Sequence, residues 1–179
     1  MKATGIVRRI DDLGRVVIPK EIRRTMRIRE GDPLEIYTDN DGEVIFKKYS
    51  PIGELSSFAS QYAEVLNKIG GYPVVVCDRD HVISVAGIPK KELLERRVSP
   101  ALEEMMEQRR SFAVTGDGKK MQPVEGVDRY ALVQAPIIAA GDVCGSLMFI
   151  AGDNPVPATE TEIKLIHVGA VFLGKQMEE

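Results

Sequence analysis

The N-terminal fifty residues contain short strand patterns and one short helix pattern, which is too little apolar sequence to build a core alone. A break at Leu13-Gly14 separates the first two strand patterns, and Asp39-Asn40-Asp41-Gly42 is a strong hairpin turn signal between the last two. The predicted elements are strands at Ile6–Ile10, Arg15–Ile18, Leu34–Tyr37 and Val44–Lys47, with a helix at Pro19–Arg27. We therefore predict that two chains intertwine their N-terminal segments as a dimer.

The charge of the chain is unevenly distributed. The whole protein carries a net charge of −3, but residues 1–29 hold nine Lys and Arg side chains against three Asp and Glu, a net charge of +6. A cationic segment on an otherwise acidic protein indicates a polyanionic partner, because each cation placed against a phosphate releases condensed counterions. The alternative is an arginine-rich surface that only promotes solubility.

The N-terminal sequence resembles the AbrB family of bacterial transition-state regulators. The segments that carry this resemblance are Thr4–Arg9, Leu13–Pro19, Glu21–Arg24, Leu34–Tyr37 and Lys47–Tyr49. It implies a swapped-hairpin fold, in which two chains interleave their strands, and double-stranded DNA as the partner. It also implies that DNA is bound by Arg8, Arg15, Arg23 and Arg24, to which we add Lys2, Arg9 and Lys20 as supplementary phosphate contacts.

A domain boundary is expected at Ser50-Pro51, which divides the chain into residues 1–50 and 51–179. The second part alternates helices and strands in an order that predicts an α+β sandwich. Its expected strands are Tyr72–Cys77, Val82–Val85, Phe112–Thr115, Tyr130–Ala139 and Val143–Ala151, and its short helices are Lys90–Arg97 and Pro100–Arg110.

This order resembles the GAF family of small-molecule sensor domains, which implies a ligand held between the sheet and a covering segment at Ile88–Asp128. The identity of such a ligand is not given by the sequence. Within that segment, the glycine-rich Thr115–Lys120 is either a surface loop or a phosphate cradle, and its spacing differs from that of a P-loop.

Long helices are predicted at both ends of the second domain. The first is opened by Ser50 and Pro51, and the last by a capping box at Thr159–Glu162. Each carries an apolar stripe, and the two stripes are Leu55, Phe58, Tyr62, Val65, Ile69 and Ile163, Ile166, Ala170, Leu173, Met177. We expect both stripes to meet their counterparts in a second chain as a helical bundle, which would make the protein a homotetramer. The alternative is that they only cover the domain's own sheet.

Enzyme chemistry has little support in the sequence. Cys77 and Cys144 lack partner ligands at metal-binding spacing, so we expect buried thiols, no metal and no cofactor. His81 follows Asp78-Arg79-Asp80 in ordinary turn composition. Two alternatives stay open: a GAF-type thiol redox enzyme, and an antitoxin-like operator-binding protein.

The expected function is that of a sequence-specific DNA-binding regulator, with a second domain for oligomerisation and small-molecule sensing. No apolar run reaches the roughly 18 residues of a spanning helix, and the first residues lack the apolar core of a signal peptide, so a cytoplasmic, nucleoid-associated protein is expected. The second domain and the ending Phe172–Glu178 resemble the sporulation regulators that share the AbrB-type module. This implies both activation and repression of sporulation genes.

Overall fold

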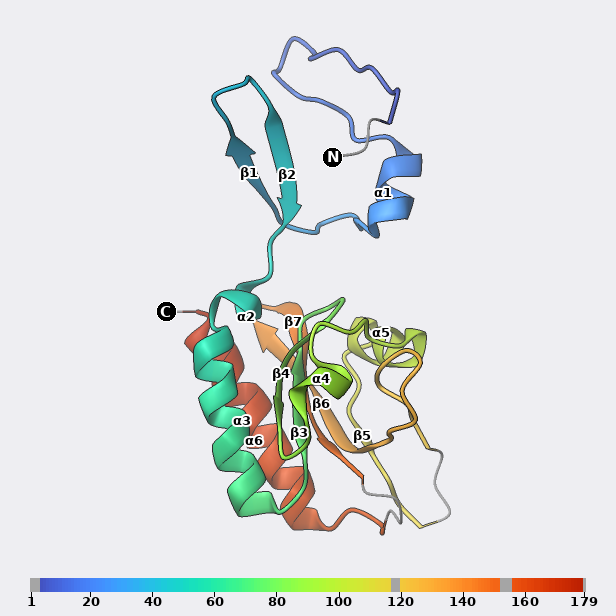
Figure 1. Cartoon of the computed structure of the whole chain (residues 1–179), viewed down its shortest axis with the longest axis vertical. Helices are drawn as coiled ribbons and strands as arrows, with labels where there is room; N and C mark the ends of the chain where they lie inside the picture. Colours follow the sequence, from blue (N-terminus) through green and yellow to red (C-terminus); the bar gives the residue numbers. More distant parts are fainter. Residues whose placement is uncertain (1–3, 117–119, 152–155, 179) are drawn as a thin grey trace. The chain divides into compact units, whose positions relative to one another are not determined.

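The computed structural model describes residues 4–116, 120–151 and 156–178. The chain forms two compact units, Met1–Tyr49 and Ser50–Glu179, and each is described by itself (Figure 1).

Unit 1 contains one helix and one antiparallel hairpin. The helix is α1 (Lys20–Met26), and the hairpin pairs β1 (Leu34–Thr38) with β2 (Val44–Lys48). Pro19 precedes the helix at its N-cap, and Arg27 ends it in the left-handed conformation with a φ of 50°. In the hairpin turn, Asp39 Oδ1 accepts hydrogen bonds from the amides of Asp41 and Glu43, as expected for a turn that begins with aspartate.

Residues 6–10 and 15–18 are not strands in the single chain, so the two strands predicted there are not observed within one protomer. A strand requires a neighbour to pair its backbone groups, and the described residues of this chain supply none. The side chains of these segments are uncovered: Val7 is 86% exposed and Val17 is 71% exposed. Such apolar exposure is what intertwined strands would leave when one chain is considered alone.

Unit 2 is an α+β sandwich built on a five-stranded antiparallel sheet with the strand order β4-β3-β7-β6-β5. Its elements are α2 (Pro51–Glu54), α3 (Ser56–Gly70), β3 (Val74–Cys77), β4 (Val82–Ala86), α4 (Lys90–Leu93), α5 (Pro100–Glu107), β5 (Phe112–Ala113), β6 (Ala131–Ala139), β7 (Asp142–Ile150) and α6 (Glu160–Gln176).

The sheet has a core on each face. Helices α3 and α6 lie side by side along one face, while α4, α5 and their loops cover the other (Figure 1). Phe149 and Leu147 on β7 point to the first core, and Met148 and Ile150 point to the second, as strand alternation requires. The sheet is therefore buried on both faces, which explains its nearly continuous apolar strands.

Several predicted helices of unit 2 are shorter than expected, and α5 ends at Glu107 where the prediction extended to Arg110. The first long helix is interrupted at Leu55, which separates α2 from α3. The helix predicted at Lys90–Arg97 ends at Leu93 because Glu95 adopts a φ of 62°, and the reversed chain then pairs with the first residue of β4. A tertiary backbone pairing thus overrides local helix propensity.

The last helix begins as predicted and packs differently from the prediction. Thr159 and Glu162 form the expected capping box at the start of α6. The predicted interface residues Ile166, Ala170 and Leu173 are at most 1% exposed and lie in the core, with Ile163 and Met177 packed against it. The assignment of the α6 stripe to an intermolecular interface is therefore wrong.

A close backbone approach is the physical reason for this packing. A Cβ atom at Gly174 would lie 2.1 Å from the carbonyl oxygen of Ile138, so only glycine lets the helix lie so close to β6. The stripe beside Gly174 has no room for a second chain.

Candidate nucleic-acid interface

Arg15 lies in a turn that Asp11 organises. Asp11 Oδ1 accepts hydrogen bonds from the amides of Leu13 (3.0 Å) and Arg15 (2.8 Å), and Asp11 Oδ2 accepts one from Arg15 Nε at 2.8 Å. Gly14 completes the turn with a φ of +76°, which favours glycine. The Arg15 side chain is held at its Nε and is still 68% exposed, so the rest of its guanidinium faces solvent.

The electrostatics of the turn agree with this geometry. Hydrogen bonds from Arg15, first from its backbone amide and then from its side chain, hold the pKa of the Asp11 carboxyl below its usual value. The ionised Asp11 carboxylate thus holds both the backbone and the side chain of Arg15 in place. The sequence prediction missed this residue, although an aspartate three positions before a glycine is a typical turn signal.

Helix α1 presents a cationic face. Lys20, Arg23 and Arg24 are exposed and are spaced by three and four positions, so they share one side of the helix. Like charges at this spacing destabilise an isolated helix, because they repel one another across one turn. An anion placed against this face would relieve that repulsion.

The remaining predicted DNA contacts lie in the N-terminal stretch. Arg8 and Arg9 are exposed in the extended segment before the Asp11 turn. Backbone pairing of Asp11 N with Arg15 O at 3.0 Å brings the two arms of this turn together. Lys2 lies outside the described residues, as do the central residues 117–119 of the predicted glycine-rich loop.

Unit 1 also exposes much of its apolar surface. Its uncovered large apolar side chains are Ile6, Val7, Ile10, Leu13, Val16, Val17, Met26, Ile36, Tyr37, Val44, Ile45, Phe46 and Tyr49. The described part of helix α1 buries no residue fully. A unit with this distribution lacks an adequate core of its own.

A second apolar surface lies on unit 2, where α3 and α6 run side by side. We call it the helix-pair surface. Phe172 of α6 packs against Phe58 and Tyr62 of α3 with tilted rings, whose centroids are 5.9 Å and 5.5 Å from that of Phe172. Its most exposed members are Val65 and Ile69 of α3, which the sequence predicted, and Val168, Val171 and Phe172 of α6, which it did not.

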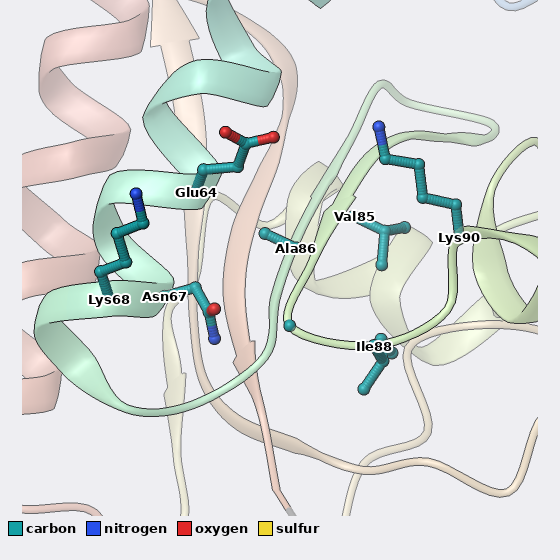
Figure 2. A pocket seen from close by; sticks show the side chains of 8 residues that line it. Glu64, Asn67, Lys68, Val85, Ala86, Ile88 and Lys90 are labelled. Atoms are coloured by element: carbon teal, nitrogen blue, oxygen red, sulfur yellow. The ribbon is translucent and has the colours of Figure 1, made fainter.

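A shallow pocket of about 230 Å³ lies between α3 and the β4–α4 connection. Figure 2 shows Glu64, Asn67 and Lys68 on the helix side and Ile88 and Lys90 across from them. The lining carries charges of both signs, and Asn67 Nδ2 already donates to the carbonyl of Tyr72 at 2.8 Å. This pocket lies at the edge strand β4 and contacts only the first residues of the covering segment implied for a GAF-like domain.

The two cysteines are buried and free. Burial, reinforced by the neighbouring charge of Asp78, strongly raises the pKa of the Cys77 thiol, and burial also raises the pKa of Cys144. Both thiolates are disfavoured. Within the described ranges, no group of three or more metal-ligating side chains converges, and no helix is long and apolar enough to cross a membrane.

Comparisons with known families and proteins cover both units. Residues 54–178 match the family described as "Stage V sporulation protein T C-terminal, transcription factor", and residues 7–53 match "Antidote-toxin recognition MazE, bacterial antitoxin". Stage V sporulation protein T of Bacillus subtilis (strain 168) is 52% identical over 181 residues, which covers 100% of both chains.

Two further matches concern the separate units. The transition state regulatory protein AbrB of Bacillus subtilis (strain 168) is 65% identical over 51 residues, covering 28% of this chain and 52% of AbrB. Unit 2 shares its fold with the GAF domain of a phosphoenolpyruvate-protein phosphotransferase from Coxiella burnetii. That match has a TM-score of 0.53 and 15% identity, and it covers 69% of this chain and 82% of the GAF domain.

An AbrB-like unit followed by a GAF-like sandwich defines a transcription factor of two units. The chain belongs to the stage V sporulation protein T family.

Proposed function

We propose that this transcription factor binds double-stranded DNA through Arg8, Arg15, Arg23 and Arg24, with Lys2, Arg9 and Lys20 as supplementary phosphate contacts. The observation that carries the proposal is the cationic face of α1, together with an Arg15 that Asp11 holds in an exposed turn. Guanidinium groups fixed in this way can bind phosphates or the edges of guanine.

Dimerisation would strengthen this interaction. The net charge of +6 on residues 1–29 becomes +12 when two chains combine their N-terminal units. The long-range attraction then steers the dimer to the duplex, and individual arginines decide which sequence is retained.

Replacing Arg8, Arg15, Arg23 and Arg24 by alanine, one at a time, tests the proposal. An arginine that reads a base should cost about 1–3 kcal/mol of binding free energy, whereas one that contacts only phosphate should reduce the salt slope by about one unit. Fluorescence anisotropy with genomic fragments at several salt concentrations measures both. Arg110→Ala in unit 2 is the control, and unchanged affinity in all four arginine variants of unit 1 would refute the assignment.

Replacing Asp11 by alanine tests the proposal further, because the loss of a negative charge and the loss of the Arg15 turn have opposite expected effects on DNA affinity. Removing a carboxylate from a DNA-binding face should strengthen binding if charge alone mattered. We expect Asp11→Ala to weaken binding about tenfold, because the Arg15 turn loses the carboxylate that holds it. Asp12→Ala removes the same charge one position away, and it should leave affinity equal or slightly higher. Equal effects of the two changes in anisotropy titrations would contradict the role of Asp11.

The same proposal includes the assembly state. The exposed apolar side chains of unit 1 support a dimer of intertwined N-terminal units, and the helix-pair surface supports a second contact between copies of unit 2. If each chain uses a different partner at its two ends, the assembly closes as a homotetramer with two DNA-binding faces.

We assign the protein a regulatory and non-enzymatic role in the cytoplasm, acting as both activator and repressor of sporulation genes. The raised pKa values of both cysteines count against the thiol redox alternative. The match of residues 7–53 to an antitoxin model favours the antitoxin alternative, but the folded unit 2 differs from the short disordered tail of such proteins.

A small-molecule ligand of unit 2 is the last part of the proposal. The core between the sheet and α5 contains Met106, Met121 and Met148, whose flexible side chains repack readily. Facing the same side, the fully buried Gln134 donates from Nε2 to Ser146 Oγ, while its Oε1 atom accepts no hydrogen bond from the described residues. An unpaired buried acceptor costs about 1–3 kcal/mol, which a ligand with an N–H or O–H group would recover.

A further inference from the structure

The carboxylate of Asp78 joins the start of unit 2 to the turn between β3 and β4. Asp78 Oδ1 accepts hydrogen bonds from the amides of Asp80 and His81, both at 2.7 Å. Asp78 Oδ2 accepts a hydrogen bond from Ser50 Oγ at 3.1 Å. The same Ser50 oxygen accepts from the amide of Gly53 at 3.1 Å and thereby caps α2. Ser50 directly follows Tyr49, the last residue of unit 1.

The β3–β4 turn is hydrogen-bonded to residues 95–99, the segment that precedes α5. Val98 N donates to Asp80 O, and Val82 N donates to Arg96 O, both at 2.9 Å. His81 and Arg97 form an isolated antiparallel bridge. This segment, residues 95–99, is therefore hydrogen-bonded to the start of β4 and to the turn that contains Asp78.

Residues 121–125 are in turn hydrogen-bonded to residues 95–99. Glu125 N donates to Arg97 O at 3.0 Å, Ser99 N donates to Pro123 O at 2.9 Å, and Ser99 Oγ donates to Gln122 O at 2.6 Å. Val98, Leu102 and Val124 are buried in the core beneath α5. Residues 95–99 and 121–125 are thus the cover of that core, and we call them the cover segments.

We infer that the Ser50–Asp78 hydrogen bond transmits the position of the cover segments to the connection with unit 1, and so regulates DNA binding. The path consists of hydrogen bonds without a gap, from Gln122 through Ser99 and residues 95–98 to the Asp78 turn and Ser50. A molecule that enters the core beneath α5 and displaces the cover segments would, through these hydrogen bonds, shift the residue that follows unit 1. This inference rests on the proposed function.

Variants at Ser50 separate the two hydrogen bonds that this residue makes. Aspartate and asparagine both cap a helix well, so Ser50→Asp and Ser50→Asn each retain the cap of α2. The asparagine amide can still donate to Asp78, whereas an aspartate has no proton to donate and repels the carboxylate. Ser99 Oγ also accepts a hydrogen bond from the Leu102 amide at 3.1 Å and thereby caps α5. Ser99→Ala perturbs the cover by removing both this cap and the bond to Gln122 O, and Ser99→Gly removes the same two bonds with a residue that is better tolerated at an N-cap.

The experiment combines the Ser99 change with each Ser50 background in the full-length protein. Hydrogen exchange of the peptide that covers residues 50–55 and anisotropy with a retained DNA fragment are measured for every variant. We expect Ser99→Ala to change the exchange rate and the DNA affinity by about threefold or more in the wild-type and Ser50→Asn backgrounds, and to change neither in Ser50→Asp.

Equal effects of the Ser99 change in all three backgrounds, or no effect on exchange in the wild type, overturn the inference. Circular dichroism verifies that each variant is folded, and Ser99→Gly replaces Ser99→Ala if the latter is not. Hydrogen exchange of residues 50–55 is measured without DNA, so it tests the coupling between the cover segments and Ser50 independently of DNA binding. Failure of the wild-type protein to bind DNA would overturn the proposed function and not this coupling.

Discussion

Replacing Leu173 by glutamate is expected to unfold unit 2, whereas the same change at Val171 is expected to leave it folded and to reduce the size of the assembly. Leu173 is 0% exposed and Val171 is 64% exposed, although the two residues are separated by one position on α6. A carboxylate at Leu173 would be buried without a partner in the core beside β6, which costs about 4 kcal/mol or more. At Val171 the carboxylate faces solvent in the single chain and would be buried only by a second copy.

Circular dichroism and light scattering distinguish these outcomes. Loss of the helical signal with Leu173→Glu and a folded particle of lower mass with Val171→Glu are the expected results. A Val171→Glu variant with the mass of the wild type would exclude the helix-pair surface as an interface. A folded Leu173→Glu variant would contradict the core position of that residue.

An isolated fragment of residues 1–50 is expected to unfold when it is diluted. Its apolar side chains are exposed in a single chain, so the fragment gains a core only by association, and its stability must depend on concentration. The midpoint of thermal unfolding should rise with concentration, and the folded fragment should have twice the mass of one chain. The fragment should also bind long DNA more weakly than the intact protein, because it lacks the second contact between copies.

Circular dichroism melts over a hundredfold range of concentration, together with sedimentation, measure these properties. A melting temperature independent of concentration would show that one chain folds alone. Equal affinity of the fragment and the intact protein for long DNA would contradict an assembling role for unit 2.

Local sequence signals predicted much of unit 2. The capping box at Thr159 and Glu162 places the start of α6, and apolar runs bounded by turn residues place the long strands to within one residue at most ends. These elements depend on neighbouring residues in the chain. Boundaries set by distant pairing were not predictable in the same way, as the early end of α4 and the reversal at Glu95 show.

The α6 stripe was misassigned because heptad spacing alone does not identify the partner. The buried stripe of Ile166, Ala170 and Leu173 and the exposed stripe of Val168, Val171 and Phe172 lie side by side on one helix. The sequence of α6 did contain a signal for a second apolar stripe, since a helix that is apolar on most of its circumference is normally covered on two sides. The close contact at Gly174 that decides between the stripes depends on β6, far away in the sequence.

Within the DNA-binding candidate, the family resemblance named the arginines and the charge distribution agreed with it, but neither signal predicted how the arginines are held. Asp11 was counted only as a negative charge, and its hydrogen bonds to Arg15 became visible in the folded turn. The bond between Ser50 and Asp78 joins residues separated by 28 positions, and no spacing pattern predicts such a contact.

The uncovered apolar side chains of unit 1 have a consequence for how the protein responds to its own synthesis. If a newly made chain completes its N-terminal core only by pairing with a second chain, as we propose, the amount of folded, DNA-competent protein rises with the square of chain concentration at low levels. Slow accumulation would leave chains exposed to proteolysis, whereas a burst of expression would protect them by pairing. Target genes would then switch over a narrow range of protein concentration and would follow the rate of production more closely than the presence of the gene product.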